Sequence, residues 1–266
     1  MNSSAPHKSA GSGFGPPNGG PRRGGTQGRV PQIGFDRFIQ LDWISAVLAV
    51  RDGISTLAEL KELLESSGLG KEALAKSLTK LNGLGLQPRR DLANFIDRGR
   101  STVRVGSPAK GVAAYGWAVS IATYPFFGKV AELTGRLTSL QGDCSVAEIH
   151  RRMVEVYGDR EVIRRATQAV LQTQSNWGVL QRVDKGKRII RLAPLIVDND
   201  EFIAWVIEAA VRYYGKPISV PTLQSLPVLF PFKLTRPLAY TVSNSPNLDL
   251  RLEGPSNQFV ALRSTI

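Results

Sequence analysis

A stretch of 17 residues without a charged side chain, Gly111 to Phe127, constrains the fold of this chain more than any other segment. Such a stretch has to be buried, either in a lipid bilayer or in the core of the protein. A helix that spans a bilayer needs about 20 strongly apolar residues, whereas this stretch contains two glycines, two tyrosines, Ser120, Thr123 and Pro125. We therefore expect a buried helix in a protein core, and no membrane partner.

The formal net charge of +12 is concentrated in two parts of the chain. Residues 1–31 carry four basic and no acidic side chains, and residues 145–191 carry ten basic and five acidic ones. Residues 192–266 balance at six of each. A concentrated basic field favours polyanions such as nucleic acid. Solvated surface lysines and arginines, without any polyanionic partner, are the alternative explanation.

The first two regions differ sharply in composition. Residues 1–31 are rich in glycine, proline and serine and have little to bury, which predicts a disordered basic tail. Residues 32–106 predict an N-terminal helical domain, for which a degenerate helix-turn-helix is one interpretation. Phe38, Leu41 and Ile44 follow helical spacing there. The pattern Thr56-Leu57-Ala58-Glu59 predicts a capping box that opens a second helix.

Residues 112–195 predict a central winged-helix domain, most clearly between Phe126 and Leu192. An amphipathic helix follows Pro125, and Ser145-Val146-Ala147-Glu148 predicts a second capping box. A third helix is expected from Arg160 to about Trp177. Two β-branched runs flank a Lys-Gly turn after it and predict a hairpin. The side chains that we expect to be buried in the third helix are Val162, Ala166, Ala169, Val170, Thr173 and Trp177.

The opposite side of the third helix carries side chains suited to DNA. Arginine reads guanine and glutamine reads adenine in the major groove, and a recognition helix places such residues along one face. The hairpin adds cations that would contact phosphates. We therefore predict DNA contacts from Arg160, Arg164, Arg165, Gln168 and Gln172 on the helix, and from Arg182, Lys185, Lys187, Arg188 and Arg191 on the hairpin.

Residues 198–266 predict a C-terminal, degenerate winged-helix domain. A helix after Asp198 or Asp200 would be followed by shorter helices at 221–226 and 235–242, and then by a wing built from 248–252 and 259–262. Three prolines interrupt this plan and the region has no net charge, so packing or pairing suits it better than DNA binding. The expected fold class is mainly α with small β-hairpins (α+β), with tandem winged helix-turn-helix domains preceded by a helical domain.

Residues 115–266 resemble the tandem winged-helix protein of bacterial BREX phage-defence systems, the BrxA family. The resemblance lies in Ser145–Leu192, in the acidic-capped helix and second small wing that follow, and in the string Asn176-Trp177-Gly178-Val179-Leu180. The glycine-rich tail is not part of it. The resemblance implies a double-stranded DNA-binding component of a multi-protein anti-phage system, with other defence-system proteins as partners and without catalysis of its own.

Residues for catalysis or metal binding are scarce in this sequence. His7 and His150 are the two histidines and Cys144 is the one cysteine, so no intrachain disulfide and no metal site built on several cysteines can form. We expect no enzyme activity, no cofactor, no metal and no small-molecule substrate. The start of the chain lacks the apolar core of a secretory signal, and the cysteine content suits a reducing cytoplasm.

Three functions remain open at this point. The favoured one is a non-enzymatic protein that binds double-stranded DNA. The second is a winged-helix protein-protein adaptor in a DNA-processing complex, which the aromatic residues and balanced charge of 198–266 favour. The third is a transcriptional regulator, which would prefer one DNA sequence.

Overall fold

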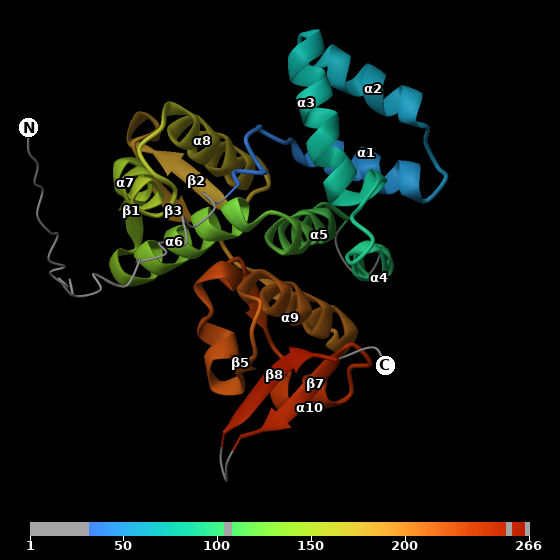
Figure 1. The fold of residues 1–266 in the computed structure, drawn as a ribbon, viewed down its shortest axis with the longest axis vertical. Helices are drawn as coiled ribbons and strands as arrows, with labels where there is room; N and C mark the ends of the chain where they lie inside the picture. The colour runs from blue at the N-terminus through green and yellow to red at the C-terminus, as the bar shows by residue number, and fades with distance from the viewer. Residues whose placement is uncertain (1–31, 104–107, 254–256, 264–266) are drawn as a thin grey trace, which may run out of the picture. The chain divides into compact units, whose positions relative to one another are not determined.

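The N-terminal part of the computed structural model consists of four helices (Figure 1). The structure describes residues 32–103, 108–253 and 257–263, so the predicted tail, 1–31, lies outside the described residues. The full capping box at Thr56 is formed, as predicted, but Phe38 precedes the first helix rather than belonging to it. The elements are α1 (Leu41–Arg51), α2 (Leu57–Ser66), α3 (Lys71–Leu81), the turn η1 (Asn82–Leu86) and α4 (Ala93–Val103).

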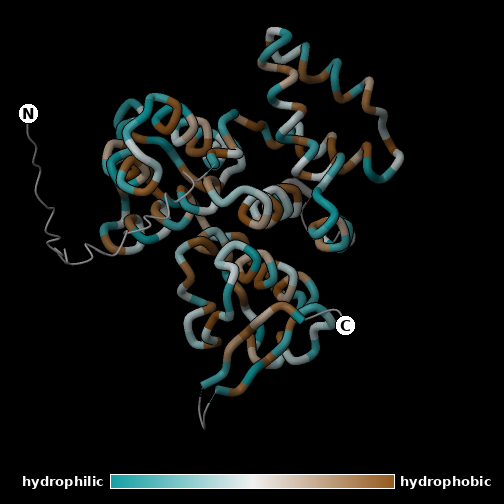
Figure 2. The backbone as a smooth tube through the Cα atoms, in the orientation of Figure 1, coloured by the Kyte–Doolittle hydropathy of each residue, from teal (hydrophilic) through white to brown (hydrophobic). Residues whose placement is uncertain are grey.

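From Gly111 onward, the helix α5 (Pro108–Thr123) is buried on all sides. Every residue from Gly111 to Thr123 is buried, and α1, α4, α6 and α9 all contact the helix. Figure 2 draws α5 mostly in white to brown, whereas hydrophilic residues recur along α2 and α3. The prediction of a buried core helix is therefore confirmed. Within the described residues, no helix is long and apolar enough to cross a membrane.

Two buried aromatic side chains of α5 form hydrogen bonds to backbone carbonyls of neighbouring elements. The indole N–H of Trp117 donates to the carbonyl of Val228 at 3.0 Å, and the hydroxyl of Tyr115 donates to the carbonyl of Leu84 at 3.1 Å. A buried polar group without a partner costs roughly 1–3 kcal/mol. These two hydrogen bonds therefore restrict which elements can pack against α5.

The middle module, residues 125–191, contains the three predicted helices and the predicted hairpin. A short strand after the first helix was not predicted, and it pairs antiparallel with the last strand, so the sheet order is β1-β3-β2. At Ser145 the hydroxyl caps α7, but Glu148 does not complete the predicted box. The elements are α6 (Pro125–Gln141), β1 (Asp143–Ser145), α7 (Val146–Tyr157), α8 (Glu161–Asn176), β2 (Leu180–Val183) and β3 (Arg188–Arg191).

The last module, residues 200–262, has the helix–strand–helix–helix–hairpin order of the middle module, with η4 and β6 inserted between its second and third helices. Its first strand pairs with its last strand, and the antiparallel sheet has the order β5-β8-β7. The helix expected at 221–226 is a 3-10 helix, and the one expected at 235–242 is short. The elements are α9 (Asp200–Tyr214), β5 (Ile218–Ser219), η3 (Val220–Ser225), η4 (Pro227–Leu229), β6 (Phe232–Leu234), α10 (Leu238–Ser243), β7 (Leu248–Leu252) and β8 (Gln258–Leu262).

Contacts join these parts across the predicted domain boundaries. The strand β4 (Leu195–Val197) follows the middle module and pairs in parallel with β6 of the last module. The indole N–H of Trp205 on α9 donates to the carbonyl of Phe95 at 2.8 Å, and the two rings stack. The described residues are mainly helical with three small sheets, an α+β fold. The division at 106–112 and at 195–198 remains a prediction, since residues 31–266 form one unit.

The contact between α6 and η4 depends on a residue without a side chain. A Cβ atom built on Gly135 would lie 2.0 Å from the carbonyl oxygen of Pro227. That separation is much shorter than a van der Waals contact, and the oxygen atom that the Cβ would meet belongs to the backbone. The two elements can therefore approach this closely only with glycine at position 135.

We expect Gly135→Ala to lower the free energy of unfolding by about 1–3 kcal/mol, because the added methyl group overpacks this contact. In an open helix interior the same change would stabilise by about 1 kcal/mol. Urea denaturation followed by tryptophan fluorescence measures the difference. Ser139→Ala, at an exposed position one turn later on α6, is the matched control and should leave stability unchanged or slightly higher. A Gly135→Ala protein as stable as the wild type would contradict this packing.

Candidate nucleic-acid interface

The helix α8 separates an apolar side from a polar one, and the polar side is open. Ile163, Ala166, Val170 and Thr173 are buried. Val162, predicted to be buried, is 42% exposed, because the inward position falls one residue later, at Ile163. The opposite side forms the surface that we call the α8 face, which consists of Arg164, Arg165, Gln168 and Gln172.

The two arginines of the α8 face are held only by exposed acids of their own helix end. The side chain of Arg164 is 57% exposed and lies 3.5 Å from Asp159, and that of Arg165 is 78% exposed and lies 3.1 Å from Glu161. Exposed ion pairs of this kind contribute little to stability. Both guanidinium groups can therefore exchange these acids for the phosphates of a ligand.

Arg160 does not lie within α8, contrary to the prediction. It is the N-cap residue of the helix, with extended backbone angles, and it makes no side-chain cap. Its guanidinium donates to the carbonyl of Tyr157 at 3.2 Å, and the residue is exposed. The structure therefore places this cation at the end of the α8 face that carries Arg164.

The hairpin supplies one cation that contacts α8 directly. When the side-chain amide of Gln168 is oriented with its oxygen toward Arg182, that oxygen accepts hydrogen bonds from both terminal nitrogens of the Arg182 guanidinium, at 2.7 and 2.8 Å. Arg182 also donates to the carbonyl of Gly186 at 3.3 Å. The predicted base-reading role of Gln168 therefore competes with this bond, while Gln172 is exposed and its side chain has no hydrogen-bond partner among the described residues.

The turn of the hairpin carries two exposed lysines. Lys185 has a φ of 52°, in the left-handed region, and lies in the tight turn between β2 and β3. Lys185 and Lys187 are exposed, and no carboxylate of the described ranges forms an ion pair with either one. Both amines are therefore available to a phosphate.

The side chains of the other two hairpin arginines contact neighbouring elements of the protein. Arg188 binds both carboxylate oxygens of Asp143 on β1, at 2.6 and 2.5 Å, and this contact lowers the pKa of Asp143. Arg191 donates to the hydroxyl of Thr138 at 2.5 Å and lies over the ring of Phe230. Predicted as phosphate contacts, these two cations instead hold β3 to its neighbours, and they do not join the α8 face.

A segment from the other end of the sequence completes the surface. The amide of Ile39 donates to the Thr173 hydroxyl, and the indole N–H of Trp177 donates to the Ile39 carbonyl, each at 3.0 Å. Residues 35–40 are thereby fixed beside α8 (Figure 1). A groove of about 510 Å³ results between this segment and α8. It is lined by Asp36, Arg37, Phe38, His150, Glu161, Arg164, Arg165, Gln168, Ala169 and Gln172.

Arg37 is the residue of this groove that the sequence reasoning missed. Its Nε atom is enclosed and has no hydrogen-bond partner among the described residues. Arg37 lies 127 positions before Arg164 in the sequence, so no local pattern links the two. The one available signal was indirect: Thr173 and Trp177 are polar groups on a buried stripe, and such groups need partners.

His150 on α7 lines the groove, and Arg151 and Arg152 follow it on the same helix. Burial lowers the pKa of His150, and the nearby charges of Arg164 and Arg182 lower it further. Glu148 has its pKa lowered to about 2 by hydrogen bonds from Arg151 and Arg152, so it stays ionised and neutralises part of their charge. His150 is therefore a neutral group that lines the groove beside cations, and its protonation would add to the positive charge.

No family model matches this chain, and comparison with curated proteins and with solved structures likewise gives no significant match.

The lowered pKa of His150 gives a stability that depends on pH. In a His7→Ala variant, His150 is the sole histidine, and NMR titration of its ring should give a pKa below the usual 6.5. Because the unfolded chain then binds the proton more tightly than the folded one, the free energy of unfolding should fall as the pH drops below about 6.5. A folded-state pKa at or above 6.5 would contradict the burial of this ring.

Proposed function

We propose that this protein is a non-enzymatic protein that binds double-stranded DNA through the α8 face. The observation that carries the proposal is the row of exposed Arg164, Arg165 and Gln172 on one helix, next to a hairpin whose lysines have no acidic partner among the described residues. Arginine and glutamine are among the side chains that recognise base edges in the major groove. The helix α8, 16 residues long, has the length and the exposed side that a recognition helix requires.

The topology of the middle module supports a winged-helix interpretation. Three helices precede a two-stranded hairpin, and the short strand β1 between the first two helices pairs with the second hairpin strand. In such a domain the third helix enters the major groove. The hairpin at Lys185 and Lys187 would then contact the phosphate backbone beside it. The same order in the last module favours a tandem arrangement.

Arg37 and Arg182 are suited to contact phosphates in this arrangement. Arg37 lines the groove beside α8 and has an unpartnered Nε atom, and Arg182 lies against Gln168. Cations that neutralise phosphates supply most of the affinity for any DNA sequence, whereas groups that reach base edges supply preference. General affinity with modest sequence preference is the behaviour that this mixture favours.

The wider biological role rests on the resemblance to the BrxA family and remains a prediction. The cytoplasmic location and the partnership with other defence-system proteins also remain predictions. An adaptor role would leave partner binding intact when the α8 face is reversed in charge. A transcriptional regulator would bind one DNA sequence at least about 1,000-fold more tightly than others.

Charge reversal of the α8 face tests the proposal directly. We expect Arg164→Glu combined with Arg165→Glu to weaken binding to a duplex of about 30 base pairs by at least about 100-fold at low salt, since two phosphate or base contacts become repulsive. Fluorescence anisotropy of labelled DNA measures the affinity. Lys61→Glu combined with Lys216→Glu makes the same change in net charge at exposed positions on α2 and after α9, and should bind like the wild type to within a few-fold. Equal loss in both double variants would leave only a non-specific charge effect and overturn the assignment.

The hairpin lysines should control the salt dependence rather than the sequence preference. Each phosphate contact that is removed lowers the slope of log affinity against log salt by about 0.9. Lys185→Ala combined with Lys187→Ala should therefore reduce that slope by about 2 and weaken binding to all duplexes alike. Anisotropy titrations between about 50 and 200 mM salt give the slope. An unchanged slope would place the hairpin away from the DNA.

A further inference from the structure

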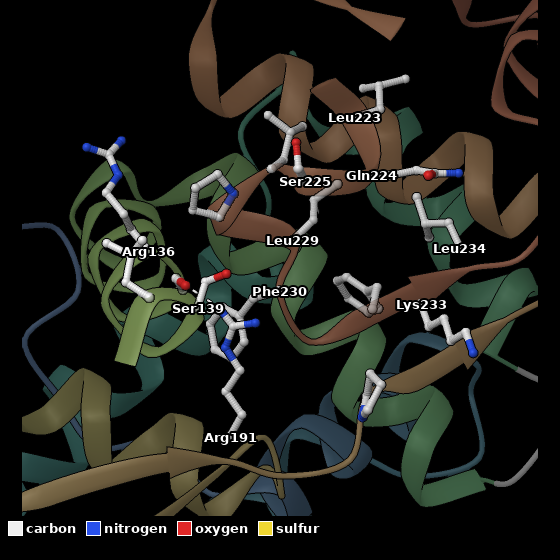
Figure 3. A pocket seen from close by; sticks show the side chains of 16 residues that line it. Arg136, Ser139, Arg191, Leu223, Gln224, Ser225, Leu229, Phe230, Lys233 and Leu234 are labelled. Atoms are coloured by element: carbon white, nitrogen blue, oxygen red, sulfur yellow. Dashed lines mark hydrogen bonds between the residues drawn. The ribbon is translucent and has the colours of Figure 1, made fainter. Parts of the chain in front are cut away.

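A second cleft lies on a different part of the molecule, where the middle module meets the last one. Its volume is about 680 Å³, and α6, β3, η3, η4 and β6 contribute to its lining (Figure 3). Among its sixteen lining residues are three cations, Arg136, Arg191 and Lys233, and no carboxylate. The charge of this cleft is therefore not balanced by its own walls.

Arg191 is the central cation of the cleft. It donates to the Thr138 hydroxyl and to the Gly135 carbonyl, and its guanidinium carbon lies 4.9 Å from the centre of the Phe230 ring. All of these partners are neutral, and within the described part of the chain no carboxylate forms an ion pair with it. Burial lowers its pKa. A half-buried guanidinium without a counter-charge is electrostatically unsatisfied, so it favours an anion beside it.

The other two cations differ in their surroundings. Arg136 pairs with Glu132 at 2.8 Å, and Figure 3 shows its guanidinium directed away from the cleft. Lys233 on β6 is exposed, and no acid of the described residues pairs with it. Arg191 would therefore bind the anion, while Lys233 adds attraction at longer range.

Part of the wall around Arg191 is apolar, and serine and glutamine side chains line other parts of it. Leu226, Leu229 and Phe230 line the cleft, and Leu140 lines it with 76% of its surface exposed. Clefts of about 300–1,000 Å³ with apolar walls and a few polar groups are the usual form of small-molecule sites, often where two parts of a protein meet. These apolar residues and the unpaired Arg191, with Lys233 at longer range, together define the chemistry of the ligand.

We infer that this cleft binds a small organic anion, in which a carboxylate or sulfonate group pairs with Arg191 and an aromatic or aliphatic body packs against Leu226, Leu229 and Phe230. The site shares no residue with the α8 face or with the groove beside it. It is therefore independent of DNA binding, and it would give the protein a ligand that the sequence reasoning did not expect.

Binding of a matched pair of probes tests the inference in the absence of DNA. The probes are 2-naphthoate, which carries an aromatic body and a carboxylate, and 2-naphthamide, which has the same body without charge. Isothermal titration calorimetry should show the anion binding at least about tenfold more tightly than the amide, because the bond to Arg191 is charge-assisted. Equal affinities, or no binding of 2-naphthoate at millimolar concentration, would overturn the inference.

A variant that fills the cleft locates the binding. Ser139 is exposed and lines the cleft, so Ser139→Trp should weaken 2-naphthoate binding at least about tenfold without removing an existing contact. Gln141→Trp, two residues later at an exposed position outside the cleft, should bind like the wild type. Equal binding to Ser139→Trp and Gln141→Trp would place the probe elsewhere and overturn the inference.

Replacement of the cation tests its role separately. Arg191→Met should remove the preference for the anion and leave the weak affinity for 2-naphthamide unchanged. Since Arg191 also ties β3 to α6, circular dichroism must first establish that this variant folds. If it does not fold, the comparison of Ser139→Trp with Gln141→Trp still decides the inference. A folded Arg191→Met protein that keeps the tenfold preference would contradict it.

Discussion

The burial of α5 on every side is the constraint on which the rest of the structure depends. A helix that is apolar all round has no side to offer to water, so it is stable only when other elements enclose it. Here α1 and α4 come from before it in the sequence, and α6 and α9 from after it. The bonds from Trp117 to Val228 and from Tyr115 to Leu84 restrict the arrangement further, because each indole or phenol must meet one particular carbonyl. Enclosing α5 therefore requires the N-terminal helices and both modules to fold together.

That enclosure reaches the candidate DNA-binding surface through Trp177. A Cβ atom on Gly116 of α5 would lie 3.2 Å from the Trp177 ring, and Phe127 packs against the same ring at 5.7 Å between centres. The indole N–H of Trp177 then holds the carbonyl of Ile39, which places Arg37 beside α8. A core contact thus sets the position of a surface cation that is remote in sequence. The groove beside α8 is a product of the packing as much as of the helix that lines it.

The five cations of the hairpin carry the same charge but have different surroundings and partners. Lys185 and Lys187 lie exposed at the turn, Arg182 contacts Gln168 of α8, and Arg188 pairs with Asp143. Arg191 reaches α6 and the ring of Phe230 instead. Successive side chains of a strand point to opposite faces, and the neighbours on each face decide the outcome. Asp143 becomes the partner of Arg188 only because the three-residue strand β1 pairs with β3, 45 positions later.

The sequence by itself determined the features that depend on near neighbours. These are the helices and hairpin of residues 125–191, the capping box at Thr56 and the burial of α5, because helical periodicity, caps and turns depend on residues a few positions apart. Even there, one inward position of α8 was wrong: Ile163 is buried in place of Val162, whereas Ala166, Ala169, Val170, Thr173 and Trp177 are buried as predicted. Only the tertiary structure decided where residues 35–40 lie, which arginines remain exposed at the surface, and that a cleft forms around Arg191. Each of these depends on which carbonyl, carboxylate or ring the packing brings close from a distant part of the chain. A local sequence pattern does not contain that information.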